Sequence, residues 1–244
     1  SGEVFAVERN GAGLAALCEK LLTLGPAIVA IEATGGFEEI AAASLAGAGL
    51  PLVVVDPAQV RSFAKAIGQR AKTDPIDAAV IAHFAEATKP EIRPLPDEET
   101  RHLSELVARR RQIVEMIGAE KQREKRAVLK RTRRSIARIV TALPKELEEM
   151  DGDIGTAVRA SPAWREKEDL LASVPGVGPI ISRTLIAEMP ELGSLDRKEI
   201  AALAGLAPYA RQSGTWRGRS FIGGGRTRVR TVLFMGAMNA KRWN

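Results

Sequence analysis

Two short, continuous apolar runs constrain the fold of this chain most. Ala27 to Ile31 and Pro51 to Val55 contain only apolar residues, a pattern typical of strands that are buried on both faces. Helical patterns lie between and after these runs, and Val4 to Val7 is predicted to form a further strand. This alternation predicts an α/β layer fold with a largely parallel sheet over residues 1–95.

Carboxylates follow both runs directly. Glu32 comes after the first run, and a carboxylate at the carboxyl end of a central strand faces the crevice in which α/β folds bind ligands. Glu32 is therefore a candidate site residue, with a solvated strand end as the alternative. Asp56 comes after the second run and precedes a proline, so it is predicted to cap a helix from Pro57 to Ile67.

A second pair of carboxylates lies in Lys72-Thr73-Asp74-Pro75-Ile76-Asp77-Ala78. Pro75 suits the first position of a helix and Asp74 its N-cap, and a spacing of three places Asp74 and Asp77 on one helix face. Two oxygen ligands with no His or Cys beside them suit a hard cation, Mg²⁺ or Mn²⁺. The same pattern also resembles a capping box, and the residues alone leave both interpretations open.

Three prolines between Lys89 and Pro96 predict a linker, and two long helices are predicted to follow it. The apolar stripe of the first helix is Leu103, Leu106, Ile113, Val114 and Ile117. The second carries two series at intervals of seven, Ile136, Leu143 and Met150 with Val140, Leu147 and Ile154. This seam predicts an antiparallel coiled-coil arm over residues 96–162, which turns back within 127–132 and is kinked or restarted at Pro144. The seam could close within the chain or against a partner.

The positive charge of the chain is concentrated in two regions. Residues 109–138 hold 12 Lys and Arg against 3 Glu, and residues 205–244 hold 8 Lys and Arg and no acid, although the whole chain carries only +6. This layout indicates a nucleic-acid partner, with a solvated helical face and a basic tail as the alternative. Aromatic residues make up only 4% of the chain, which favours arginine contacts to phosphate over base stacking. Arg133 and Arg134, near the tip of the arm, are candidate contacts.

Residues 163–244 carry two further patterns. Val174-Pro175-Gly176-Val177-Gly178 lies between two apolar helical segments and predicts a helix-hairpin-helix, in which Gly176 and Gly178 let backbone N–H groups approach a phosphate; a purely structural turn is the alternative. The loop that follows holds hydroxyls among arginines. Ser213 is its best candidate for a nucleophile, with Tyr209 and Ser220 as rivals and a plain polar loop residue as the alternative. The candidate phosphate contacts are Arg211, Arg217 and Arg219 in the loop and Arg226, Arg228 and Arg230 in the next helix.

Composition excludes some classes of protein. The single cysteine, Cys18, excludes an internal disulfide and suits a reducing compartment. No apolar run approaches the roughly 18 residues that a membrane span needs, and no signal segment opens the chain. A cytoplasmic location without a membrane partner is predicted.

Taken together, these motifs resemble one family along essentially the whole chain. The acid at the strand end, the Lys-Thr-Asp-x-x-Asp-Ala motif, the heptad arm, the Pro-Gly-Val-Gly turn and Gln212-Ser213-Gly214 occur in the order found in DEDD (RuvC-like) transposases of bacterial insertion sequences. That family is related to the pilin-gene invertase Piv and is now known as bridge-RNA-guided recombinases. The full set of motifs is quite specific, whereas any one of them alone is weak.

The resemblance implies an RNase H-like (RuvC-like) α/β domain over residues 1–95, a coiled-coil arm over 96–162, and a mostly α-helical helix-hairpin-helix domain over 163–244. It assigns Glu32, Asp74 and Asp77 to a site for Mg²⁺ (or Mn²⁺) and Ser213 to the nucleophile. It also implies double-stranded DNA and a structured guide RNA as partners, and assembly into a dimer or tetramer. The family's first aspartate has no match here, so the sequence is expected to be a fragment.

Two other functions are consistent with the residues. In a RuvC-type, metal-dependent nuclease that acts on branched DNA, Ser213 would take no part. In a non-catalytic DNA-binding module, the helix-hairpin-helix and the basic arm would account for the whole function.

Overall fold

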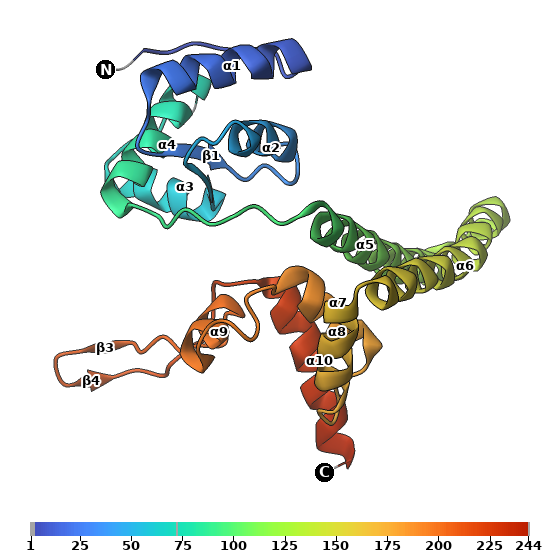
Figure 1. Cartoon of the computed structure of the whole chain (residues 1–244). Helices are drawn as coiled ribbons and strands as arrows, with labels where there is room; N and C mark the ends of the chain where they lie inside the picture. Colours follow the sequence, from blue (N-terminus) through green and yellow to red (C-terminus); the bar gives the residue numbers. More distant parts are fainter. Residues whose placement is uncertain (1–2, 72, 244) are drawn as a thin grey trace. The chain divides into compact units, whose positions relative to one another are not determined.

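The computed structural model describes residues 3–71 and 73–243. Lys72, the first residue of the Lys-Thr-Asp motif, lies outside the described residues. The chain forms two compact units that divide between Leu95 and Pro96 (Figure 1).

The first unit contains a small parallel sheet and four helices. Its elements are α1 (Gly11–Leu24), β1 (Val29–Glu32), α2 (Glu39–Gly47), β2 (Leu52–Val55), α3 (Pro57–Ala66) and α4 (Asp74–Thr88). β1 and β2 pair in parallel, with Val29 opposite Leu52 and Glu32 opposite Val55. The predicted strands at these two places and their parallel pairing are confirmed. Asp56 caps α3 as predicted, because its carboxylate accepts hydrogen bonds from the N–H groups of Ala58 and Gln59.

Two expectations for the first unit are wrong. Val4 to Val7 forms no strand; Val4, Phe5 and Val7 are exposed, and the sheet that contains β1 has two strands among the described residues. β propensity reflects the packing of side chains on a half-buried sheet surface, and these three side chains remain exposed. β1 was expected to be buried on both faces, but its residues are only half-buried. It pairs with β2 at one edge only, and a cavity of about 390 Å³ lies between β1 and α4.

The pleat of the sheet separates two cores. Val29 and Ile31 pack with α1 and α2, whereas Ile28 and Ala30 pack with α3 and α4. Successive side chains of a strand point to opposite faces, so Glu32, two residues after Ala30, belongs to the face that α3 and α4 cover. The pleat thus directs the candidate carboxylate toward these two helices.

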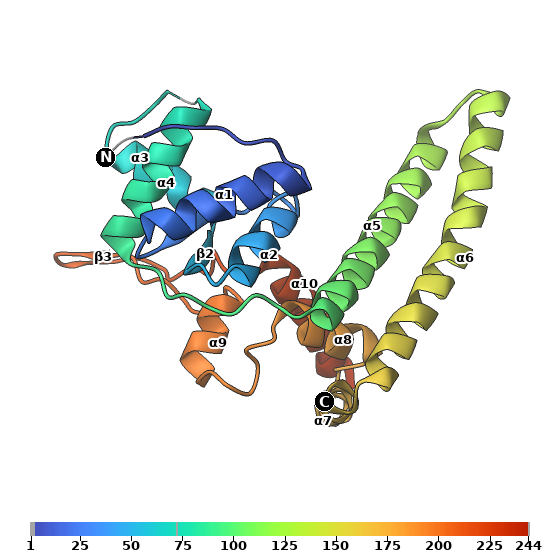
Figure 2. The ribbon, with the colours of Figure 1, turned by 45° about the horizontal axis from the view of Figure 1, so that its top comes forward.

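The second unit begins with two long helices, α5 (Glu98–Arg126) and α6 (Lys130–Ala160), which lie side by side and antiparallel (Figure 2). All six residues of the predicted seam on α6 are at least partly buried, and the seam closes on α5 within the chain. Arg110 of α5 also donates two hydrogen bonds to the carboxylate of Asp151 on α6, at 2.5 and 3.2 Å.

One detail of the arm differs from expectation: Val114 is exposed, whereas Val107, which was not predicted to be in the stripe, is buried. A kink or a restart was predicted at Pro144, and α6 continues through this residue without a restart. Pro144 is exposed, and it removes only the hydrogen bond to the carbonyl oxygen of Val140, a loss that a helix tolerates with a gentle bend.

The rest of the second unit is a helical core that carries a β-hairpin. Its elements are α7 (Pro162–Ala172), α8 (Pro179–Glu188), α9 (Arg197–Leu203), β3 (Gln212–Ser213), β4 (Trp216–Arg217) and α10 (Thr227–Trp243). Buried Leu185, Met189 and Val229 hold α8, α9 and α10 together. The β3–β4 hairpin extends away from these helices (Figure 1). Among the described residues, no helix combines the length and the apolar character that crossing a membrane requires.

Candidate functional site

The carboxylates of α4 lie at the start of that helix, but not as predicted. The N-cap is Thr73, so Asp74 lies within the first helical turn and is not the cap. No N-capping side-chain hydrogen bond forms there, and within the described parts of the chain neither Asp74 nor Asp77 accepts a hydrogen bond from the helix backbone. A capping box does form in the second unit, between Asp196 and Glu199. The acids of α4 are therefore not occupied by capping.

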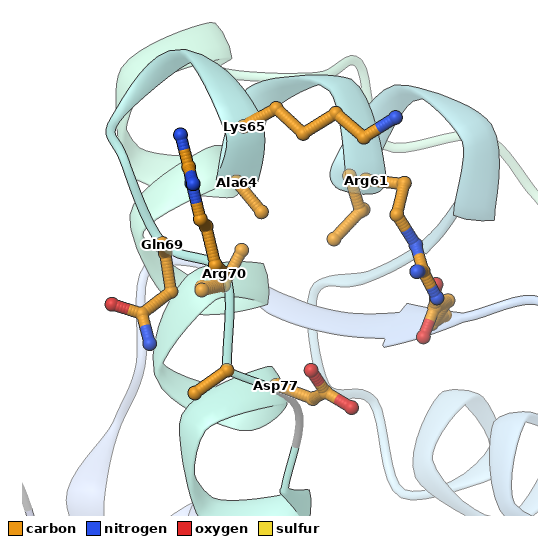
Figure 3. A pocket seen from close by; sticks show the side chains of 10 residues that line it. Arg61, Ala64, Lys65, Gln69, Arg70 and Asp77 are labelled. Atoms are coloured by element: carbon orange, nitrogen blue, oxygen red, sulfur yellow. The ribbon is translucent and has the colours of Figure 1, made fainter.

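Glu32 and Asp77 line the same cavity, which has a volume of about 490 Å³. Figure 3 shows it between α3, which carries Arg61 and Lys65 on one side, and α4, which carries Asp77 on the other. Arg70, from the segment between the two helices, also lines the cavity. Asp74 is exposed and does not contribute to the lining.

The donor set of this cavity fits a hard divalent cation. Glu32 and Asp77 supply carboxylate oxygens, and neither forms an ion pair within residues 3–71 and 73–243. Mg²⁺ is commonly held by one or two carboxylates, with water and phosphate oxygens completing its shell. Among the described residues no three His, Cys, Asp or Glu side chains converge on one point. The structure thus brings two of the three predicted ligands together.

Glu38 fixes the loop that follows Glu32. Its carboxylate accepts hydrogen bonds from the N–H groups of Thr34 and Gly36, both at 2.9 Å, and from the Thr34 hydroxyl at 3.1 Å. Partial burial acts to raise the pKa of Glu38, but these hydrogen bonds and its own backbone N–H outweigh that effect, and the pKa is lowered. Glu38 was not predicted from the sequence as a site residue. The pattern Thr34-Gly-Gly-x-Glu38 could have indicated it, because two glycines with positive φ need an anchor.

Ser213 lies in the β-hairpin of the second unit. It pairs with Trp216 across the two strands, and Gly214, at φ +55°, begins the two-residue turn. The hydroxyl of Ser213 is exposed and forms no hydrogen bond within the described chain. Tyr209 pairs with Phe221 at the base of the hairpin, with ring centroids 5.7 Å apart, and Ser220 is exposed.

The three loop arginines lie on the same hairpin as Ser213. Arg211 stacks over the ring of Phe221 at 4.6 Å, and Arg217 donates a hydrogen bond to the amide oxygen of Gln212. Arg219 is exposed and has no ion-pair partner among the residues that the structure describes. An exposed hydroxyl on a loop that carries three arginines can meet a phosphodiester without prior unpacking of the fold.

Arg226, which directly precedes α10, and Arg228 and Arg230 in the first turn of α10 have partners inside the second unit. Arg226 donates two hydrogen bonds to Glu191, at 2.5 and 2.7 Å, and these bonds raise the pKa of its guanidinium despite partial burial. Arg228 pairs with Glu188 at 3.3 Å. Arg230 donates to the carbonyl oxygen of Gly224 at 2.7 Å. These contacts give all three residues a structural role, whatever they bind in addition.

Gly176 and Gly178, in the turn of the predicted helix-hairpin-helix between α7 and α8, lie in different surroundings. Gly176 has φ +85°, and a Cβ atom placed on it would lie 2.7 Å from the Gly236 carbonyl oxygen and 2.9 Å from the Ala240 Cβ. The close approach at Gly176 is therefore to α10. Gly178 is the N-cap of α8 and has open space around it. Arg133 and Arg134 are exposed in α6 near its start at the tip of the arm.

The fold and the sites define a basic protein with a carboxylate cavity in an α/β unit and an exposed, arginine-flanked serine in a helical unit. Residues 3–133 match the transposase domain of the DEDD, IS110 type, and residues 168–244 match the transposase domain of the IS116/IS110/IS902 family. The chain belongs to this transposase family. The DEDD domain implies an RNase H-like fold for the matched region.

Two curated relatives are the pilin gene-inverting proteins of Moraxella bovis and Moraxella lacunata. Each is 29% identical to the chain over 224 residues, a match that covers 85% of the chain. The chain spans 65% of the length of these relatives.

Proposed function

We propose that this chain is the strand-exchanging part of a DNA transposase or recombinase of an insertion sequence, which cuts and rejoins DNA through a covalent serine–phosphate intermediate at Ser213. Membership of the transposase family and the similarity to pilin gene-inverting proteins support this proposal. The observation that carries it is the position of Ser213, which is exposed on the hairpin loop that also carries Arg211, Arg217 and Arg219.

The proposed step conserves phosphoester bonds. The Oγ atom of Ser213 attacks a backbone phosphorus, the bond from phosphorus to one sugar oxygen breaks, and that sugar oxygen takes up a proton. The serine proton passes to a carboxylate or to water. Attack by the sugar hydroxyl of another strand reverses the step and releases Ser213, so rejoining needs no external energy source. Arg211, Arg217 and Arg219 hold the phosphate and stabilise the charge that develops on it.

The carboxylates of the first unit form the second part of the proposal. Glu32, Asp74 and Asp77 would hold Mg²⁺ or Mn²⁺, which supplies a Lewis acid for the phosphate oxygens and lowers the pKa of a bound hydroxyl. Glu32 and Asp77 already line one cavity, and Asp74 lies one helical turn before Asp77. We further propose double-stranded DNA and a structured guide RNA as partners, a homo-oligomer as the working form, and a cytoplasmic location.

The remaining predicted contacts complete the proposal. Arg133 and Arg134 at the tip of the arm are proposed to bind nucleic-acid phosphates, as is the turn around Gly178, where the start of α8 is open. Pairing of α7 and α8 through this turn supports the helix-hairpin-helix assignment, and the buried seam of α6 supports the coiled-coil assignment.

A metal-dependent nuclease is the second candidate, because the carboxylate cavity is formed by the first unit without any contribution from Ser213. Ser213→Ala distinguishes the two functions, with Ser220→Ala as the matched control on the same hairpin. The assay is strand exchange on the ends of the protein's own insertion element, with the RNA of that element, with and without Mg²⁺. The recombinase proposal expects Ser213→Ala to abolish cleavage and exchange while Ser220→Ala retains both; cleavage at the normal rate by Ser213→Ala would favour the nuclease.

A further inference from the structure

Three basic side chains share the cavity of Glu32 and Asp77, and neither the family match nor the sequence analysis assigns them a role. Arg61 and Lys65 extend from α3, and Arg70 comes from the segment between α3 and α4 (Figure 3). All three are exposed. Within the described chain none of them forms an ion pair with Glu32, Asp77 or any other acid. The cavity thus contains charges of both signs that the fold leaves unneutralised.

The first unit has few basic residues, and three of them line this cavity. Residues 1–95 contain 8 Lys and Arg against 11 Asp and Glu, so the unit is net acidic, yet three of its eight cationic residues line one cavity. The position of Lys65 in the last turn of α3 can be explained by the helix dipole. That explanation does not extend to Arg61, a full turn earlier, or to Arg70, which lies outside the helix.

The spacing of these residues suits a nucleic-acid backbone. Arg61 and Lys65 are four residues apart on α3 and therefore lie on one face, about 6 Å apart at their Cβ atoms. That is close to the separation of neighbouring phosphates along an extended strand. Guanidinium groups recognise phosphate oxygens in pairs, and a phosphate next to two carboxylates needs such cations to offset their repulsion.

We propose that Arg61, Lys65 and Arg70 hold the backbone of a DNA single strand in this cavity and position one of its phosphates beside Glu32 and Asp77. This inference rests on the proposed function, in which these two carboxylates act on DNA. The three basic residues are positioning residues, and their role is distinct from that of the arginines around Ser213, which lie in the other unit.

The test measures how steeply DNA affinity falls with salt. The chain, the triple variant Arg61→Gln/Lys65→Gln/Arg70→Gln, and a control with the same charge change, Arg9→Gln/Lys89→Gln/Arg93→Gln, bind a fluorescein-labelled single-stranded DNA oligonucleotide across a salt series. The control residues are exposed in the first unit and lie outside the cavity. Each lost phosphate contact lowers the slope of log affinity against log salt by about 0.7 for a single strand. The slope for the triple variant at Arg61, Lys65 and Arg70, hereafter the cavity variant, should therefore be lower by about 2.

That change means that, between 50 and 200 mM salt, the affinity of the chain falls about fifteen-fold more than that of the cavity variant. Equal slopes for the two triple variants would overturn the proposal. The proposal is also wrong if the three replacements lower the salt slope for binding RNA of the same sequence and leave the salt slope for binding DNA unchanged. All six replaced residues are exposed, so unchanged thermal melting is expected of both variants.

A second arm tests whether the basic residues and the carboxylates share one phosphate. In a chelating buffer, Glu32→Gln/Asp77→Asn should tighten DNA binding severalfold, because it removes two negative charges beside the bound phosphate. The same change made in the cavity variant should have little effect, because the phosphate is no longer held there. Equal tightening in both backgrounds would refute a shared site. Neither arm requires strand exchange, so a failure of the Ser213 proposal would show separately, in the cleavage assay.

Discussion

Replacing Gly176 with alanine should destabilise the second unit, because two independent features of the structure oppose a Cβ at this position. The backbone lies at φ +85°, which costs an L-residue about 1–2 kcal/mol. The new methyl would also lie 2.7 Å from the Gly236 carbonyl oxygen and 2.9 Å from the Ala240 Cβ. Forcing a methylene into a packed contact typically costs about 1–3 kcal/mol, so the two effects together should cost about 2–5 kcal/mol.

Gly178 provides the matched control, two residues away in the same turn. Its φ of −98° is allowed for alanine, and no atom lies within 4 Å of a Cβ placed there. Loss of a glycine N-cap and the reduced entropy of the unfolded chain are opposing effects of similar size, so Gly178→Ala should change stability by less than about 1 kcal/mol.

Urea unfolding followed by tryptophan fluorescence measures both variants. The three tryptophans, at positions 164, 216 and 243, all belong to the second unit, so the signal reports on that unit. If Gly176→Ala unfolds at the same urea concentration as Gly178→Ala, the packing of Gly176 against α10 is wrong. If both variants keep their stability and lose DNA binding alike, both glycines serve phosphate contact instead.

Two further predictions concern stability. Hydrogen bonds from the folded backbone lower the pKa values of Glu38 and Asp97, for Glu38 against an opposing effect of burial. Each ionised carboxylate therefore stabilises the fold fully at a pH above its pKa in the unfolded chain. That stabilisation is lost as the pH falls through the lowered pKa of the folded state. Melting temperatures should therefore fall between pH 5 and pH 3, and Glu38→Gln should reduce that fall; an unchanged pH dependence in Glu38→Gln would contradict this. Arg226→Lys should destabilise the second unit by about 2 kcal/mol in urea unfolding, because lysine keeps the charge but cannot form both hydrogen bonds to Glu191, whereas Arg219→Lys should have no effect.

Local patterns predicted the elements whose causes are local. The strands at Val29–Glu32 and Leu52–Val55 follow from apolar, β-branched runs, and the start of α3 follows from Asp56 and Pro57. The seam of α6 follows from its seven-residue spacing. Val4 to Val7 has a similar apolar character but remains exposed outside the sheet, and no local pattern reports that.

The candidate site was only partly predictable, because its geometry depends on tertiary contacts. Glu32 and Asp77 were identified from their positions in the chain, and the pleat of β1 together with the packing of α4 brings them to one cavity. The basic side chains in that cavity were missed. Arg70 lies in an irregular segment, and nothing in the sequence shows that the segment returns toward β1. The role of Gly176 depends on α10, which begins about fifty residues later in the chain.

The chemical identity of the covalent intermediate tests the proposed role of Ser213 most directly. The reaction on element-end DNA with Mg²⁺ is stopped with denaturant, the protein is digested, and the peptide that carries a nucleotide is sequenced by mass spectrometry. A serine nucleophile predicts a single adduct, a phosphodiester between a nucleotide and the Oγ atom of Ser213, which is absent from Ser213→Ala. An adduct on Tyr209 or Ser220, or complete strand exchange with no protein–DNA adduct, would contradict it.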